Sequence, residues 1–224
     1  MKRQWVISDI TPDFLARMEK ILHLYKQGYD PKRPVLCFDE RPCFLIGDVL
    51  QPIPMSEGQS KREHYEYEKN GSACVLLAFE AHTGRRFVKV FKQRTAKEYA
   101  EFMAYLEQQY PEAVSITIVQ DNLNTHNEGS FYKWFEAQKA FELAQKYQFV
   151  FTPKKASWLN MAEIEFSALS KQCLDRRIGS IELLRSEVIA WVDARNQAGV
   201  TVNWQFSIEA ARENFSKKYY SVKT

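Results

Sequence analysis

The chain has no long apolar segment. None of its uninterrupted apolar runs approaches the ~18–20 residues that a helix needs to cross a lipid bilayer. The start, Met1–Asp9, also lacks the extended apolar stretch of a secretory signal. These two absences predict a cytoplasmic protein that makes no contact with a membrane.

Cysteine is scarce, and its spacing forms no pattern. The four cysteines are Cys37, Cys43, Cys74 and Cys173, with no C-x-x-C pair and no histidine pair near them. Neither a zinc site nor a disulfide framework is therefore expected. Cys37 and Cys74 lie within apolar runs, which predicts buried free thiols.

The chain also lacks a large net charge of either sign. The formal net charge is +3 and the pI is near 8.5, whereas strongly basic nucleic-acid binders usually have a pI above ~9. With 224 residues, 45% of them hydrophobic and 26% charged, the composition is typical of one folded domain, with or without an extension. Four cations flank Glu163: Lys154, Lys155, Arg176 and Arg177. Their charge alone favours a solvated surface over a nucleic-acid contact.

The spacing of apolar residues predicts alternating strands and helices. Strands are expected at 35–39, 73–79, 87–91, 116–119 and 149–152, and helices at 11–28, 95–110, 129–147, 160–175 and 181–197. Residues 42–55 are predicted to pair back as a hairpin, which Pro42, Pro52 and Pro54 would confine to an edge or a loop. Asn70-Gly71 predicts a turn. The order β, β, β, α, β, α, β, α is that of the α/β ribonuclease H-like fold, a mixed central sheet flanked by helices.

Three acids stand where these elements end or begin. Asp39 closes the first strand, Asp121 follows the fourth, and Glu163 lies where a helix starts. Hard divalent cations prefer carboxylate oxygens as ligands. Three such acids on separate elements therefore suggest a divalent-metal site.

Each acid also has a purely structural explanation. Asp39 and Asp121 could cap turns after their strands. Asn160-Met-Ala-Glu163 has the pattern of a capping box. Glu165 lies about 200° farther round the same helix than Glu163, so the two cannot face one site. Glu40 points to the opposite face of the strand from Asp39, which makes it a weaker candidate.

Three segments resemble a known family: Val35-Leu-Cys-Phe-Asp39-Glu-Arg-Pro42, Asp121-Asn-Leu-Asn-Thr-His126 and Thr152-Pro-Lys-Lys-Ala-Ser-Trp-Leu-Asn-Met-Ala-Glu163. In this order they resemble the DDE-type transposases of bacterial insertion sequences, in particular the insertion-sequence-630 family of the mariner-like superfamily. Further family-like segments are Tyr65–Tyr67, Gln172–Ile178 and Asn203-Trp204, so the resemblance covers the chain from Trp5 onward. Full-length relatives carry an N-terminal helix-turn-helix region, whereas about 34 residues precede the first strand here. The chain thus resembles the catalytic part.

The resemblance implies a role for each of these residues. Asp39, Asp121 and Glu163 would be the catalytic acids and would hold two Mg²⁺ (or Mn²⁺) ions, which activate water or a DNA 3′-hydroxyl for attack on a phosphodiester. Without metal, the three acids repel one another, so at least one tends to keep its proton. DNA contacts and accessory roles are implied for a second set: Lys154, Lys155, Trp158, Arg176 and Arg177 for DNA, with Asn122 and His126 as accessory residues.

The resemblance also implies partners and limits. Double-stranded DNA would be bound as element ends and as target, by two copies of the chain that pair two ends, in the bacterial cytoplasm and at the nucleoid. Residues 1–33 would form a helical lead-in, 34–175 the catalytic core, and 176–224 a C-terminal helical extension of the same domain. Two other functions stay open: a nuclease of the same fold without joining activity, and an inactive remnant that only binds DNA or a partner chain.

Overall fold

The computed structural model describes residues 10–60, 62 and 64–221. Trp5, where the family resemblance was predicted to begin, lies outside the described residues. In the part of the chain that is described, no helix combines the length and the apolar character that crossing a membrane requires.

A five-stranded mixed sheet forms the centre of the molecule, in the order β3-β2-β1-β4-β5. The strands are β1 (Val35–Asp48), β2 (Tyr67–Glu80), β3 (Arg86–Phe91), β4 (Ile116–Gln120) and β5 (Tyr147–Phe151). The first three pair antiparallel, whereas β4 runs parallel to β1 and β5 runs parallel to β4. This confirms the predicted mixed sheet.

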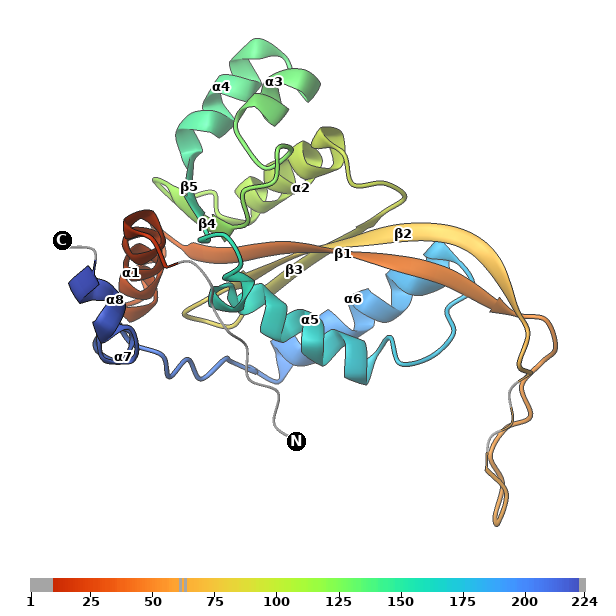
Figure 1. The fold of residues 1–224 in the computed structure, drawn as a ribbon. Helices are drawn as coiled ribbons and strands as arrows, with labels where there is room; N and C mark the ends of the chain where they lie inside the picture. The colour runs from red at the N-terminus through yellow and green to blue at the C-terminus, as the bar shows by residue number, and fades with distance from the viewer. Residues whose placement is uncertain (1–9, 61, 63, 222–224) are drawn as a thin grey trace.

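Helices cover both faces of the sheet (Figure 1). On one face lie α2 (Ala96–Gln109), α3 (Gly129–Trp134) and α4 (Ala137–Lys146); on the other lie α1 (Pro12–Lys26), the short helix η1 (Ser157–Leu159), α5 (Met161–Gln172) and α6 (Ile181–Gln197), with α7 (Ile208–Asn214) and α8 (Ser216–Ser221) beside α1. A hydrophobic core lies on each face of the sheet, the first under α2 to α4 and the second under α1, α5 and α6. Side chains alternate along β1, so Leu36 and Phe38 enter the first core, and Val35 and Cys37 enter the second. The second core holds residues of α1, α5, α6 and α7 together.

The predicted hairpin at residues 42–55 is wrong, because β1 continues straight through Pro42 to Asp48. Pro42 lies opposite Cys74 in the β1–β2 ladder. Since β4 pairs only with Val35–Cys37, β1 has a neighbour on one side only at Pro42, and an edge tolerates a residue without an N–H. Pro42 therefore lies on an edge, which belongs to β1 itself, while Pro52 and Pro54 lie outside any strand, beyond the end of β1.

The turn predicted at Asn70-Gly71 is also wrong, because both residues lie inside β2. The register passes from Phe44↔Ser72 to Ile46↔Lys69, so Asn70 and Gly71 together oppose Leu45, as in a β-bulge. Gly71 has φ of +94°, a conformation that glycine adopts without strain. The chain reverses between β1 and β2, and the described residues of this connection, 49–60, 62 and 64–66, form a projecting arm (Figure 1).

The other elements follow the sequence closely, with one interruption. Helix 129–147 is divided into α3 and α4, and Tyr147 belongs to β5, where it pairs with Ile116. The helix predicted at 181–197 is confirmed as α6. Cys37 and Cys74 are buried free thiols, as predicted. The domain limits at 33 and 175 stay a prediction.

Candidate active site

The parallel pairing of β1 with β4 brings Asp39 and Asp121 to one place. Cys37 lies opposite Val119 in this ladder. Asp39 is two residues beyond Cys37, and Asp121 is two residues beyond Val119, so the two acids lie at the same level. Asp121 directly follows β4, whereas the prediction that Asp39 closes its strand is wrong, because β1 continues to Asp48 and Asp39 pairs there with Leu77. The carboxyl end of parallel strands is where α/β enzymes commonly place their chemistry.

The start of α5 is fixed beside the same strand. The Asn160 side chain donates from Nδ2 to the backbone oxygen of Phe38 over 2.8 Å and accepts from the Ala162 N–H over 3.1 Å. It therefore caps α5 and joins that cap to the residue before Asp39. Glu163 lies in the first turn of α5.

The predicted capping box at Asn160 and Glu163 is only half present. The Asn160 side chain caps the helix, but its own N–H donates to Ser157 O over 2.7 Å. This bond occupies the donor that the Glu163 carboxylate would accept from. Glu163 is exposed and forms no ion pair with a described cation.

The electrostatics of Asp39 show that the three acids influence one another. Burial, together with the nearby Glu163, Asp121 and Glu40 carboxylates, raises the pKa of Asp39 to about 7, although the Glu40 N–H donates to its Oδ1 over 2.8 Å. A carboxyl group with such a pKa is largely protonated at mildly acid pH. A cation placed among these oxygens would reverse the effect.

A buried histidine links Asp121 to a fourth acid. His126 Nδ1 lies 2.7 Å from Asp121 Oδ1, and its Nε2 lies 3.5 Å from Glu40 Oε2. Burial lowers the pKa of His126, but the hydrogen bonds and charges of Asp121 and Glu40 outweigh it and raise the pKa to about 9. The ring stacks on Tyr99, so its orientation is fixed. Arg94 Nη1 completes the chain, 3.0 Å from Glu40 Oε1.

The involvement of Glu40 was missed in the sequence. Its side chain does face away from Asp39, as expected for an adjacent strand residue, but the segment after Asp121 returns to that face and presents His126 there. In the sequence, only the position of Glu40 next to Asp39 and that of His126 five residues after Asp121 pointed to this interaction.

Glu165 is placed very differently from Glu163. It is fully buried, and it accepts from Arg86 Nη2 over 2.9 Å and from Arg195 Nη2 over 3.2 Å. Two guanidinium groups thus neutralise a carboxylate that points into the protein. Glu165 has no freedom to serve the site formed by the other acids.

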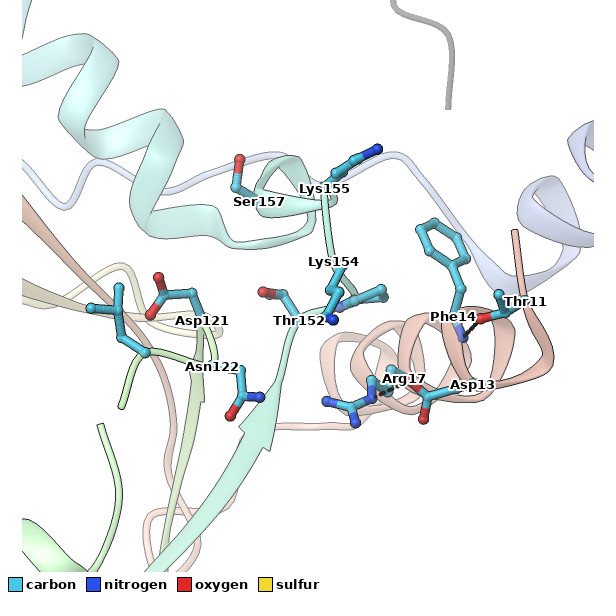
Figure 2. A pocket seen from close by; sticks show the side chains of 12 residues that line it. Thr11, Asp13, Phe14, Arg17, Asp121, Asn122, Thr152, Lys154, Lys155 and Ser157 are labelled. Carbon is cyan, nitrogen blue, oxygen red and sulfur yellow. Dashed lines mark hydrogen bonds and ion pairs between the residues drawn. The ribbon is translucent and has the colours of Figure 1, made fainter. Parts of the chain in front are cut away.

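Next to Asp121 lies a cavity of about 600 Å³, between the N-terminal half of α1 and the ends of β4 and β5 (Figure 2). Asn122, Lys154 and Lys155 line it, as does Arg17, which was not singled out in the sequence. Of the residues predicted to bind DNA, the two lysines are thus beside an acid of the site.

The other predicted DNA contacts lie elsewhere. Trp158 lines a separate hollow with Glu163, is 37% exposed, and packs edgewise on Phe206. Arg176 pairs with Glu187. Arg177 pairs with Asp48 over 2.9 Å and donates to the backbone oxygens of His64 and Glu66, so it connects the base of the arm to the end of α5. The geometry gives both arginines partners within the chain, and their contact with DNA stays a prediction.

The donor set suits a hard divalent cation, because it consists of carboxylate oxygens. Burial and, to a smaller extent, the neighbouring carboxylates raise the pKa of Asp39, and a bound cation would offset both effects. Within the described residues, no three of these side chains stand close enough to enclose an ion as they are placed. The residues therefore fit the ion chemically, and binding would draw the carboxylates together.

Comparison with solved structures shows a shared fold. The Mos1 transposase paired-end complex with left transposon end aligns with a TM-score of 0.56 and 14% identity over 87% of this chain and 59% of that one. The Mos1 mariner paired-end complex with Mn (TM-score 0.55) and a pre-cleavage Mos1 transpososome (TM-score 0.58) align over 100% of this chain and over 64% and 67% of theirs, each at 14% identity. The chain thus spans about two thirds or less of these relatives. The shared fold is the ribonuclease H-like fold.

A comparison with curated proteins finds no sequence match. The profile of the DDE superfamily endonuclease family matches residues 34–185, which begin just before β1 and end within α6. This range includes Asp39, Asp121 and Glu163, and it covers more than half of the chain. The chain is a member of the DDE superfamily of endonucleases.

Proposed function

We propose that the chain is the catalytic part of a DDE transposase of the insertion-sequence-630 type, which cleaves DNA strands and transfers them to a target in a divalent-metal-dependent reaction. The observation that carries the proposal is the convergence of the three acids. Asp39 within β1 and Asp121 just after β4 lie at one level of adjacent parallel strands, and the charge of Glu163 acts on Asp39.

In this proposal Asp39, Asp121 and Glu163 hold two Mg²⁺ or Mn²⁺ ions. Bound there, the ions would supply Lewis acidity toward a phosphodiester and its attacking oxygen. Solved Mos1 mariner structures of this fold include paired-end complexes with Mn and with Mg, which supports this choice of metals.

The remaining residues position the catalytic acids or contact the DNA. His126 contacts the Asp121 carboxylate through Nδ1, and its Nε2 faces the Glu40 carboxylate across 3.5 Å. Asn160 holds the first turn of α5 against β1, which fixes the backbone that carries Glu163. Asn122 and Lys154 lie beside Asp121, where they can contact DNA phosphates.

The partners follow from the same proposal. Double-stranded DNA is the substrate, as element end and as target, and two copies of the chain pair two ends. Related structures are named paired-end complexes, which supports this arrangement. We place the protein in the bacterial cytoplasm, at the nucleoid when it is bound to DNA.

A nuclease that cleaves without joining is the second candidate, because the family is described as one of endonucleases. The two candidates share the first step and differ in the fate of the 3′-hydroxyl. Joining of a pre-nicked, labelled end to a second duplex distinguishes them.

The test measures Mn²⁺- or Mg²⁺-dependent cleavage and joining of a labelled duplex by the wild type, Asp121→Asn and Glu163→Gln. We expect each substitution to reduce the rate by about 10³-fold or more, because a ligand of the ions loses its charge. Glu182→Gln is the matched control, since Glu182 is also an exposed glutamate in the first turn of a helix, α6.

Equal activity of Glu163→Gln and Glu182→Gln would contradict the assignment of Glu163. Cleavage that persists in EDTA would contradict the role of the metal. Absence of cleavage and joining by the wild type, with DNA binding retained, would favour the inactive remnant.

A further inference from the structure

The cavity beside Asp121 is bounded by a part of the chain outside the matched family range. Arg17 and Phe14 of α1 form one side of it, and Asn122 and Lys154 lie on the other (Figure 2). We call this cavity the lead-in pocket. Its volume of about 600 Å³ falls in the size range of small-ligand sites.

The side of the pocket formed by α1 is firmly held. Tyr25 donates from its hydroxyl to Leu159 O over 2.8 Å, which ties the end of α1 to the segment before α5. Arg212 in α7 forms two hydrogen bonds, of 2.8 and 2.9 Å, with Glu19. Phe14 itself is buried, with its ring edge against Phe215. The distance between α1 and the strand ends is therefore fixed before any ligand binds.

Three nitrogen-bearing side chains enter the pocket from different elements. Figure 2 shows the side chains of Arg17, Asn122 and Lys154 around one space, with Asp121 at its far side. Arg17 uses Nε for an ion pair of 2.8 Å with Asp13, and its guanidinium carries two further nitrogen donors. A guanidinium, an ammonium and an amide that converge are suited to the oxygens of a phosphate.

Three further lining residues are apolar, and the others carry hydroxyl or charged groups: Thr11, Asp13, Thr152, Lys155 and Ser157. Phe14, Leu123 and Pro153 contribute to the wall, and Leu123 is 39% exposed. A ligand that combines an anionic group with a flat, weakly polar part matches this division. A nucleotide within a DNA strand has that composition.

We propose that the lead-in pocket binds one nucleotide of the DNA strand next to the phosphodiester that reacts at Asp39, Asp121 and Glu163. Arg17, Lys154 and Asn122 donate to its backbone phosphate, and the apolar wall receives its sugar or base. This inference rests on the proposed function. It makes α1 a part of the DNA interface as well as a support for the core.

The first experiment measures binding of a fluorescently labelled duplex in EDTA, by anisotropy, at several salt concentrations. We expect Arg17→Gln and Lys154→Gln each to weaken binding about five- to tenfold, and to lower the salt dependence by about one counterion. Lys20→Gln is the matched control, because Lys20 is an exposed cation of the same helix that does not line the pocket. We expect a change of less than about twofold for it.

In a second pair of variants, the substitution at the pocket should strengthen DNA binding instead of weakening it. Asp13→Asn releases Arg17 from its ion pair and should tighten binding about two- to threefold. Glu112→Gln removes the same charge from an exposed position away from the pocket and should change binding less. Thermal melting of all variants checks that the fold is retained.

Uncharged replacements of single DNA phosphates identify the phosphate that the pocket binds. Methylphosphonates placed one at a time along the strand should weaken binding by the wild type and by Lys20→Gln at one position near the cleaved bond. Arg17→Gln should show no further loss at that position, since the contact is already gone.

Equal binding by Arg17→Gln and Lys20→Gln would overturn the proposal for the pocket. If the wild type still cleaved DNA in a reaction dependent on Asp121 and Glu163, the proposed function would stand alone. If the wild type neither bound nor cleaved DNA, both would fall together.

Discussion

Two glutamates of one helix show two ways of carrying a negative charge. Glu165 of α5 is buried between Arg86 and Arg195, which neutralise it permanently. Glu163, two residues earlier, is exposed and lies near Asp39 and Asp121 without a cationic partner among the described residues. The charge of Glu165 is balanced within the chain, whereas that of Glu163 would be balanced by the cation that we propose.

The comparison separates stability from function within a single helix. The ion pairs of Glu165 join α5 to β3 and α6, across 79 and 30 positions of sequence. Burial and the neighbouring acids raise the pKa of Asp39, which lowers the stability of the metal-free protein at neutral pH. We therefore expect substitutions in the two regions to change the free energy of unfolding in opposite directions.

The largest effect on folding should come from Glu165→Gln. Loss of this charge leaves the buried Arg86 guanidinium without its partner, which should reduce the free energy of unfolding by about 3–5 kcal/mol. Urea denaturation measures this loss. Glu163→Gln should change the same quantity by only about 0.5 kcal/mol. Equal losses for the two variants would remove the distinction between the regions.

Addition of a divalent metal should stabilise the protein through the acids around Asp39. Without DNA, Mn²⁺ at about ten times its Kd should stabilise the wild type by about 1.4 kcal/mol, because the ion binds only the folded carboxylates. This corresponds to a rise in Tm of roughly 3–6 °C for a chain of this size. Asp121→Asn should show little or no rise in a thermal melt. An equal rise in that variant would place the ion elsewhere.

A smaller effect should follow from the pH dependence of Asp39→Asn in EDTA. The pKa of Asp39 is about 7 in the folded protein, above its ordinary value of 3.8, so the folded state binds the proton more tightly. The resulting loss of stability is complete above pH 7 and disappears as the pH falls toward 4. Asp39→Asn should therefore raise the Tm at pH 8 by roughly 2–4 °C, an effect of about 1 kcal/mol. At pH 4 the two proteins should melt alike.

The smallest expected change concerns the histidine between the two acids. Glu40→Gln removes one of the carboxylates that raise the pKa of His126, so this pKa should fall from about 9 toward its ordinary 6.5. Titration of the ring by NMR measures the change. Glu68→Gln, at an exposed position of β2, is the control and should leave the pKa unaltered. An unaltered pKa in Glu40→Gln would show that Asp121 alone sets it.

Local pattern was enough to predict most of the fold. Apolar runs gave the positions of all five strands, because strands buried on both faces leave little room for polar residues. The same runs placed Asp121 correctly at a strand end, whereas Asp39 lies inside the longer β1, at the level where its parallel pairing with β4 stops. The arm was not predicted, because Pro42 and Asn70-Gly71 have local preferences that the β1–β2 pairing overrides with an edge and a bulge.

The contacts that complete the site depend on distant parts of the chain. Glu40 meets His126, and Arg17 comes to lie beside Lys154, only after the sheet and α1 have packed. No local periodicity carries such information. The helical period alone shows that Glu163 and Glu165 cannot both face the site, but it does not show which one does. The buried ion pair of Glu165 with Arg86 shows that Glu165 belongs to the core.

The long β1–β2 hairpin has a consequence for the connectivity of the chain. Its ladder runs from Leu36↔Glu80 to Asp48↔Tyr67, and the covalent link between the strands passes through the exposed arm. A single peptide-bond break near residue 55 would separate Asp39 from Asp121 and Glu163 covalently, while the ladder still held the two pieces together. The gene could therefore be divided at the arm, and the two halves, produced separately, would reassemble by strand complementation.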